Sequence, residues 1–331
     1  MPKIPTDTAL ALGGPTMGTR WSVLIDDPVP AARIPALQTR FQAVLSEVDR
    51  QMSTWSPDSD LMRLNAAPLQ TWVPLPSPLL TVLAAGLAIS HQTGGAFEMN
   101  VGDAVRAWGF GADKVSLTAI RAASAARRVP ATTALDLNLP AGLARKSADL
   151  ALDLSGIAKG YGVDCLAETA AAMGLTSALC AVDGEVRAIG ARQDGQPWAI
   201  SIDNPDGPPQ GSQSGPQSGP QSRTQSRRQS GLALQDMAAA TSGDYRHFVT
   251  VGTARLSHTM DPRRGAPLVA APASVTVLAH SCMMADAMAT ALTVMGAAKG
   301  ASFARQHAIS ALFLLRQPGD FGTVGTGLFA G

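Results

Sequence analysis

The sequence has few cysteines and few aromatic residues. Its 331 residues include three cysteines, Cys165, Cys180 and Cys282, which lie far apart and form no CxxC pair. This spacing argues against a zinc site and against a disulfide framework, and it fits a reducing compartment slightly better than an oxidising one. Aromatic residues make up only 5% of the chain, although 46% of it is hydrophobic. A chain of this size can bury a core without disulfides.

The sequence also lacks a charge excess and a long apolar run. The formal net charge is +1 and no basic stripe is present, which argues against a nucleic-acid partner. No apolar stretch reaches the ~18 residues that indicate a membrane span. The N-terminus has neither the apolar core of a signal peptide nor a lipobox cysteine. As written, the sequence predicts a cytoplasmic protein, or a periplasmic one if a leader is removed or export follows another route.

One segment, residues 208–230, differs in composition from the rest. It reads PPQGSQSGPQSGPQSRTQSRRQS and contains no large apolar residue. Such a stretch cannot bury enough surface to offset its ordering entropy, so we expect a disordered insertion at a strand-to-strand connection within one domain. Two interpretations stay open: an inert surface insertion, or a basic docking tail formed by Arg223, Arg227 and Arg228.

The remaining sequence mixes helices and strands without regular βαβ alternation, and it has no GxGxxG fingerprint. This predicts an α+β fold with antiparallel pairing. Apolar spacing predicts a strand over Thr19–Ile25 and helices over Ile34–Met52 and Ser77–Gln92. A strand, turn and strand are expected over Ser177–Gly190, with the turn at Asp183–Gly184. Further strand candidates are Ala233–Ser242, His247–Met260 and Ala273–Ala279.

The segment Ser281–Gly296 predicts a buried helix with one polar stripe. Ser281 is a suitable N-cap, and the helix is apolar or alanine on nearly every side except at Asp286, Thr290 and Thr293. Those three residues share a face. An unpaired buried carboxylate is costly, so two alternatives follow. Asp286 and Thr290 bind a hard cation such as Mg²⁺, or Asp286 caps a neighbouring backbone or pairs with an arginine.

A second segment, Ala151–Gly174, suggests an anion site. A short apolar strand is expected to end at Asp153, followed by a Ser155–Gly156 turn and a helix that begins near Ile157. The helix N-terminus would direct N–H groups at a phosphate. Lys159 in the first turn makes sense if an anion binds there, and otherwise it is a solvated lysine.

A third segment, Ala240–Pro267, contains the most credible proton-transfer residue. His258 lies in the polar stretch SHTMDPRRG, where a strand is expected to end at a proline-containing turn. Histidine titrates near neutral pH. A histidine at a strand end can also serve a purely structural role.

Together these segments resemble the FAD:protein FMN transferase family, known as ApbE, from about Gly14 to Arg316. The matching motifs are TMGTRWSV, MSTWSPDSDLMRLN, GGAFEMNVGDAVRAWGFG, DLSGIAKGYGVD, VDGEVRAIG, ATSGDYRHF, SHTMDPRRGAP and SCMMADAMATAL. The resemblance implies a single domain over residues 14–316 that carries the insertion. It also implies a T-fold-like arrangement of antiparallel sheets with packed helices.

The resemblance further implies a reaction and a set of site residues. Family members use Mg²⁺ to split FAD, join FMN through a phosphoester to a Thr or Ser hydroxyl of a target flavoprotein, and release AMP. The metal would be held by Asp286, Thr290 and the Gly156 carbonyl, and His258 would help the attacking hydroxyl lose its proton. The residues expected to contact FAD are Met17, Trp55, Ala96, Phe97, Glu98, Asp153, Lys159 and Met260.

The target would carry a Ser/Thr-Gly-Ala-Thr-like motif and belong to an electron-transport or nitrous-oxide-reduction system. The chain departs from the family at Ser155 and Asp183, where glycine is usual, and at Glu98–Asn100, where Asp-Pro-Thr or a similar triplet is usual. Two other functions use the same residues: an Mg²⁺-dependent FAD pyrophosphatase that yields FMN and AMP, and a non-catalytic FAD-binding or assembly protein.

Overall fold

The computed structural model describes residues 9–111, 115–202, 231–243, 248–251, 254–269, 271–317 and 320–330. The predicted insertion at 208–230, including Arg223, Arg227 and Arg228, lies outside these residues. The strands on either side of it, β8 (Trp198–Ser201) and β9 (Gly231–Leu234), pair with each other antiparallel. The single domain over 14–316 stays a prediction.

Within the described residues, eight strands form one antiparallel sheet in the order β1-β2-β6-β7-β10-β15-β16-β17. Their bounds are β1 (Leu10–Thr16), β2 (Thr19–Ile25), β6 (Ala178–Val182), β7 (Glu185–Ile189), β10 (Ala238–Gly243), β15 (Ser274–Ala279), β16 (Ser310–Gln317) and β17 (Asp320–Thr326). The predicted α+β fold with antiparallel sheets and packed helices is confirmed.

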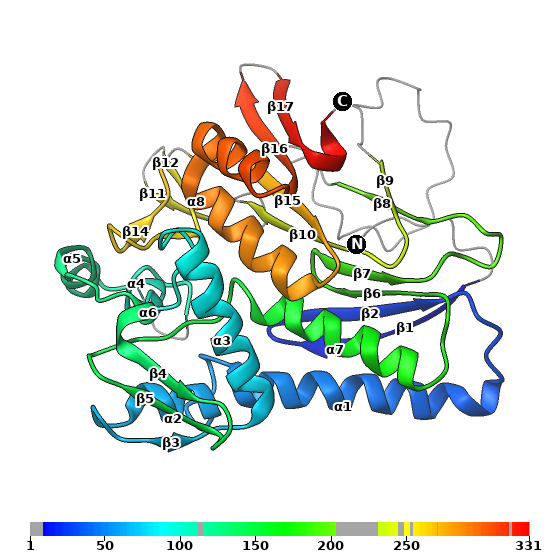
Figure 1. The fold of residues 1–331 in the computed structure, drawn as a ribbon, viewed down its shortest axis with the longest axis horizontal. Coiled ribbons are helices and arrows are strands. Elements are labelled where there is room, and N and C mark those ends of the chain that lie inside the picture. The colour runs from blue at the N-terminus through cyan, green and yellow to red at the C-terminus, as the bar shows by residue number, and fades with distance from the viewer. Residues whose placement is uncertain are drawn as a thin grey trace.

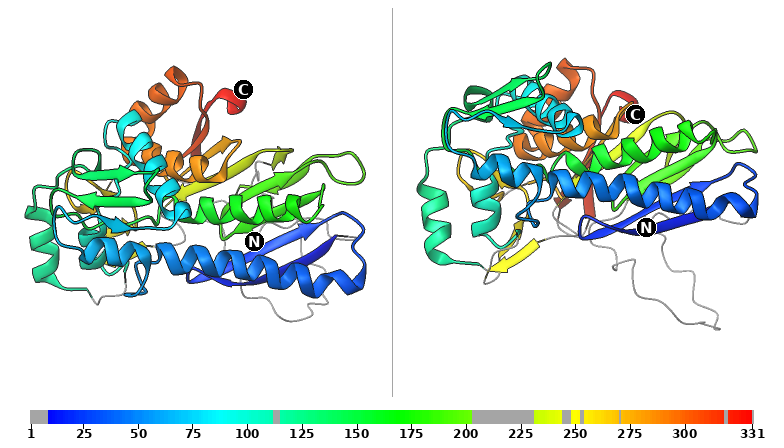
Figure 2. Two further views of the ribbon diagram at one scale, coloured as in Figure 1. Left: turned by 60° about the horizontal axis from the view of Figure 1, so that its bottom comes forward. Right: turned by 90° about the horizontal axis from the view of Figure 1, so that it is seen from below.

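Three long helices, α1 (Ile34–Met52), α7 (Ala158–Ala172) and α8 (Cys282–Gln306), pack beside one another over this sheet (Figures 1 and 2). Strand β6 shows how the sheet separates two cores. Ala178, Cys180 and Val182 face the core that includes α1 and α7, whereas Leu179 and Ala181 face the core that contains Trp198. Alternate residues of a strand point to opposite faces, which accounts for this division.

A smaller sheet, β3-β5-β4, lies beside the large one with a group of shorter elements (Figure 1). These elements are α2 (Asp60–Ala66), β3 (Val73–Pro74), α3 (Ser77–Gln92), α4 (Gly102–Ala107), α5 (Leu117–Ala125), α6 (Ala131–Ala134), β4 (Leu135–Asn138) and β5 (Leu143–Lys146). Side chains of α3 and of α8 share one hydrophobic core. That core joins the smaller part firmly to the large sheet.

Short elements complete the fold. They are η1 (Ala31–Arg33), β11 (Phe248–Val251), β12 (Ala254–Ser257), β13 (Met260–Asp261), β14 (Ala266–Pro267) and η2 (Gly327–Phe329). The three cysteines are free, and no helix in the described part of the chain is long and apolar enough to cross a membrane.

Most predicted elements have their expected bounds, including α1, α3 and β2. Two strand predictions were wrong in detail. Ala233–Ser242 is divided between β9 and β10, because a turn with Asp236 at φ 52° interrupts it. The described part of His247–Met260 forms the antiparallel pair β11–β12 and the start of β13 rather than one strand, and His247 lies outside the described residues.

The predicted strand that ends at Asp153 is also wrong. Although residues 151–154 are described, they form no strand. Their backbone groups bond to the side chains of Asn65 and Asn100 and to the backbone of Met99 and Gly102, not to a neighbouring strand. The sequence pattern correctly indicated a buried segment, but it could not show which groups its backbone bonds to.

Candidate functional site

Asp286 lies on the second turn of α8, at its contact with the start of α7. The helix is capped by Ser281, whose Oγ accepts the Met284 N–H, and its regular course is interrupted at Gly296. Asp286 is 6% exposed, so its predicted burial is confirmed. Its Oδ2 accepts the N–H of Gly160 over 3.0 Å. One of the two carboxylate oxygens of Asp286 therefore caps a neighbouring backbone, as the alternative interpretation expected.

Gly160 is the reason why the two helices approach so closely. A Cβ atom at this position would lie 2.4 Å from the Cys282 carbonyl oxygen and 2.8 Å from the Asp286 Cβ. Real side chains do not tolerate such distances to backbone atoms, so only glycine fits here. The glycine fixes Asp286 at the N-terminus of α7.

The Ser155–Gly156 turn lies against the next polar residue of α8. A Cβ atom at Gly156 would lie 3.0 Å from Thr290 Oγ1 and 3.5 Å from a ring carbon of Phe97. The turn is held by the Leu154 carbonyl, which accepts the N–H groups of Ile157 and Ala158, and α7 begins at Ala158. Within the described residues, the Thr290 hydroxyl makes no hydrogen bond.

The structure thus brings together residues that are far apart in the sequence. Gly156 comes from the turn before α7 and Lys159 from its first turn. Asp286 and Thr290 come from α8, and Phe97 comes from the segment after α3. The positive end of the α7 dipole also lies at this point, where the Gly160 N–H donates to Asp286. A buried carboxylate, a hydroxyl, an ammonium and the N-terminus of a helix therefore lie side by side.

Lys159 has carboxylate partners. Its Nζ lies 3.0 Å from both oxygens of Glu185 and 3.7 Å from an oxygen of Asp183. Burial alone would lower the pKa of the Lys159 ammonium, but the surrounding carboxylates, Glu185 foremost, outweigh burial and raise that pKa. The lysine therefore stays charged, and it is not the purely solvated side chain of the alternative interpretation.

Glu185 was not predicted as a site residue. It is 2% exposed at the start of β7, directly after the Asp183–Gly184 turn. Asp183 has a φ of 55°, which explains why glycine is the easier residue there. A buried acid that opens an otherwise mostly apolar strand was the available sequence signal, since such a charge requires a partner.

Asp286 is strongly influenced by this cluster. The pKa of Asp286 is raised to about 7, mainly by burial and further by the Glu185 carboxylate. Lys159 and the Gly160 N–H act in the opposite direction. The buried charges of Glu185 and Asp286 outnumber the single positive charge of Lys159, so the cluster would be stabilised by a further cation.

This shift predicts a pH dependence of the metal-free protein. Since the folded-state pKa of Asp286 is raised from 3.8 to about 7, its neutral form contributes stability that is fully present below about pH 4 and is lost as the pH rises through about 7. Urea unfolding of wild type and Asp286→Asn across this range should show that the wild type loses free energy of unfolding relative to the variant. A constant difference between the two proteins would contradict the shift.

Glu98 and Asp153 order the backbone near the site. Glu98 Oε1 accepts the N–H groups of Asn100 and Ala131 over 2.8 and 3.1 Å. Asp153 Oδ1 accepts the Ser155 N–H over 2.8 Å, and the Asp153 N–H donates to the Met99 carbonyl. Ala96 and Phe97 are buried in the core that α8 shares. In this structure Glu98 therefore holds together the backbone at Asn100 and at Ala131.

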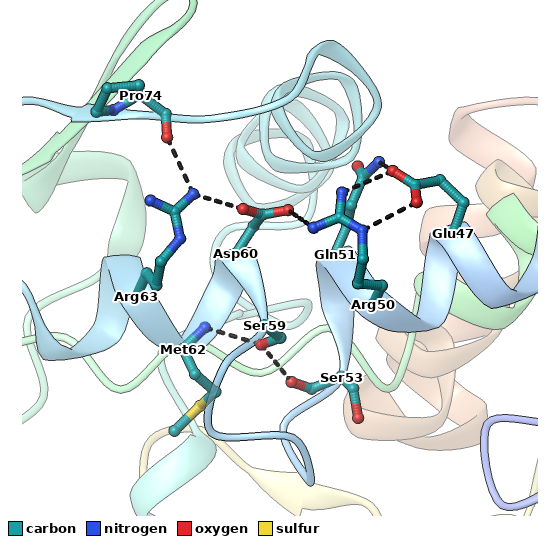
Figure 3. A network of polar contacts seen from close by, with 9 residues as sticks. All are labelled: Glu47, Arg50, Gln51, Ser53, Ser59, Asp60, Met62, Arg63 and Pro74. Atoms are coloured by element: carbon teal, nitrogen blue, oxygen red, sulfur yellow. Dashed lines mark hydrogen bonds and ion pairs between the residues drawn. The ribbon is translucent and has the colours of Figure 1, made fainter.

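Met17 and Trp55 present apolar surface from other elements. Met17, with φ 45°, lies in the turn between β1 and β2, and its Cε would be 3.1 Å from a Cβ at Gly162 of α7. Trp55 is 64% exposed in the connection between α1 and α2. Figure 3 shows the polar network that holds this connection, in which Asp60 pairs with Arg50 and Arg63.

His258 and Met260 lie with a different group of elements. Met260 is buried among residues of α4 and α5, and the His258 ring packs edge-on against Phe110 with centroids 6.4 Å apart. The assignment of His258 as the proton-transfer residue stays a prediction.

The donor set suits a magnesium ion better than a transition metal. No group of three His, Cys, Asp or Glu that could hold a metal occurs in the described residues. The residues present instead offer the Asp286 carboxylate, the Thr290 hydroxyl and the Gly156 backbone carbonyl, which are hard oxygen donors. Mg²⁺ is commonly bound by one or two carboxylates plus substrate phosphates, so the residues present fit that ion with a diphosphate.

Comparison with known proteins identifies the family. The model of the ApbE family matches residues 17–313, which include every element of the site. The chain belongs to the ApbE family. A relative from Vibrio cholerae, an FAD:protein FMN transferase, is 33% identical over 313 residues, covering 94% of this chain and 88% of that protein. One from Klebsiella pneumoniae with the same name is 31% identical over 97% of this chain and 89% of its own length.

Solved ApbE structures share the fold. The flavin transferase ApbE from Vibrio cholerae superposes with a TM-score of 0.81 at 32% identity, covering 96% of this chain and 97% of that one. The apo form of the flavinyl transferase ApbE from Pseudomonas stutzeri gives a TM-score of 0.79 at 33% identity, with 96% and 95% covered. The predicted resemblance to ApbE is confirmed.

Proposed function

We propose that this ApbE-family flavin transferase moves the FMN half of FAD to a Thr or Ser hydroxyl of a target flavoprotein, forming a phosphoester and releasing AMP. The observation that supports this reaction best is the meeting of Asp286 and Thr290 with the Gly156–Gly160 stretch. This arrangement places oxygen ligands beside a helix N-terminus, which suits a metal-bound diphosphate.

The protein groups have distinct tasks in this proposal. Asp286, Thr290 and the Gly156 carbonyl would hold Mg²⁺, which when bound neutralises the diphosphate and the charge that develops on the departing AMP. The ammonium of Lys159 and the positive end of the α7 dipole would orient the phosphates. Phe97 and Trp55 would supply ring surface for FAD.

The reaction balances without a further reactant. The acceptor oxygen forms a bond to the FMN phosphorus, the bond from that phosphorus to the bridging oxygen of AMP breaks, and the hydroxyl proton is lost. We assign acceptance of that proton to His258, because a histidine can take it near neutral pH. The acceptor would lie in a Ser/Thr-Gly-Ala-Thr-like motif.

Intact mass spectrometry tests this function. Purified protein, FAD, Mg²⁺ and a target that carries the motif should yield a target heavier by one FMN less one water, and chelation by EDTA should stop the gain. The matched control is a target whose acceptor Thr is replaced by Val. Appearance of free FMN and AMP with an unmodified target would indicate an FAD pyrophosphatase, and FAD bound without any product would indicate a binding protein. Either result would refute the transferase.

A further inference from the structure

The segment 151–154, which leads to the Gly156 turn, is held in part by two asparagine side chains. The Ala151 N–H donates to Asn100 Oδ1 over 2.8 Å, and the Leu152 N–H donates to Asn65 Oδ1 over 2.8 Å. Buried backbone groups require partners, and here no adjacent strand supplies them. The position of this segment is therefore set partly by these two side chains, together with backbone bonds to Met99 and Gly102.

Asn65 is the more complete of the two partners. Besides accepting the Leu152 N–H, its Nδ2 donates to the Leu152 carbonyl over 2.9 Å. One amide side chain thus satisfies both backbone groups of one residue, as a paired strand would. Leu152 precedes Gly156 by four residues, and the intervening Leu154 carbonyl already receives the first N–H groups of α7.

Asn65 is itself held in a fixed place. It lies near the end of α2, which begins after the N-cap Ser59. Near the start of that helix, the buried carboxylate of Asp60 pairs with Arg50 of α1 and with Arg63, and Ser59 Oγ donates to the Ser53 carbonyl (Figure 3). At its far end, the backbone carbonyl of Asn65 accepts a bond from Lys146 of β5. Both ends of α2 are therefore anchored.

We propose that Asn65 is a positioning residue that sets the place of the Gly156 turn relative to α8. It touches neither FAD nor metal in this account; it acts through Leu152 on the carbonyl of Gly156. The proposal rests on the proposed function, since it assigns the turn to the metal and diphosphate. Changes in groups that orient a metal ligand typically weaken metal affinity or activity by about 10–100-fold.

Two variants test this role. Asn65→Ala removes both bonds to Leu152, whereas Asn65→Asp keeps the acceptor and loses the donor. Amide hydrogen exchange of the apo-protein should show faster exchange across residues 150–158 in the order wild type, Asn65→Asp, Asn65→Ala. Half-saturation by Mg²⁺, followed through flavin fluorescence of the FAD-loaded protein without acceptor, should rise in the same order, by about 10–100-fold for Asn65→Ala.

Asn138→Ala is the matched control, because Asn138 makes its hydrogen bond to the Ala141 N–H in the exposed turn between β4 and β5. It should leave both readouts unchanged. If Asn65→Ala does not fold, Asn65→Ser replaces it. An Asn65 variant that is less stable but has wild-type exchange at 150–158 and wild-type Mg²⁺ half-saturation would overturn the proposal. If wild type itself transfers no FMN while exchange still follows the predicted order, the proposed function fails separately.

Discussion

Replacing Asp286 with asparagine is expected to lower kcat/KM for FMN transfer by roughly 10³-fold, because a bound metal supplies several kcal/mol of charge stabilisation and each 1.36 kcal/mol is tenfold in rate. Asparagine has nearly the same shape and its Oδ1 can still accept the Gly160 N–H that Oδ2 of Asp286 accepts. The contact between α7 and α8 should therefore persist. The loss would be one of charge and metal affinity.

The control for this variant is Asp136→Asn. Asp136 is an exposed carboxylate that pairs with Arg145 between β4 and β5, and exposed ion pairs contribute little. Steady-state kinetics with varied FAD and Mg²⁺ should show wild-type values for Asp136→Asn. Transfer by Asp286→Asn at more than a tenth of the wild-type rate, with the fold intact, would exclude a metal role for this carboxylate.

Gly160→Ala is expected to have the largest effect on stability, with a loss in the free energy of unfolding of about 3 kcal/mol, the upper end for overpacking. The added methyl group would overlap the Cys282 carbonyl oxygen at 2.4 Å and the Asp286 Cβ at 2.8 Å. Alanine is favoured over glycine in a helix by about 1 kcal/mol, and the overlap outweighs that gain. Because α8 must move, transfer should fall as well, by about 10²-fold for a displacement of 1 Å.

Gly162→Ala separates packing from helix propensity. It lies on the same helix, and an added Cβ would meet only the side-chain ends of Leu45 and Met17, each at 3.1 Å. These ends can shift by a few tenths of an ångström, so urea unfolding should place this variant within about 1 kcal/mol of wild type. Equal stability losses in the two variants would show that the close contact of α7 and α8 at Gly160 does not cause the loss in Gly160→Ala.

The sequence was most informative where a charged residue interrupted an apolar helical pattern. A carboxylate in a helix that is apolar on its other sides predicted the burial of Asp286, and the structure places that residue against α7. The N-cap at Ser281 and the break at Gly296 also follow from local chemistry. Local patterns of this kind depend on neighbours in the chain, which are visible in one sequence.

Contacts between distant segments could not be predicted in this way. The approach of Glu185 to Lys159 joins β7 to α7, and the pairing of Asn65 with Leu152 joins residues 87 positions apart. Neither Glu185 nor Asn65 belongs to a periodic pattern in the sequence. The segment 151–154 has the apolar pattern of a strand, but asparagine side chains and the backbone of Met99 and Gly102 satisfy its backbone groups, so the pattern alone wrongly predicted a strand.

A crystal structure with Mn²⁺ and FAD tests the central claim most directly, because manganese reveals its position by anomalous scattering. We predict an anomalous peak at about 2.1–2.2 Å from an Asp286 carboxylate oxygen, a distance close to that of Mg²⁺, with Thr290 and the Gly156 carbonyl beside it and the FAD diphosphate bound to the ion. A diphosphate bound elsewhere, with Asp286 still directed only at Gly160, would contradict the account.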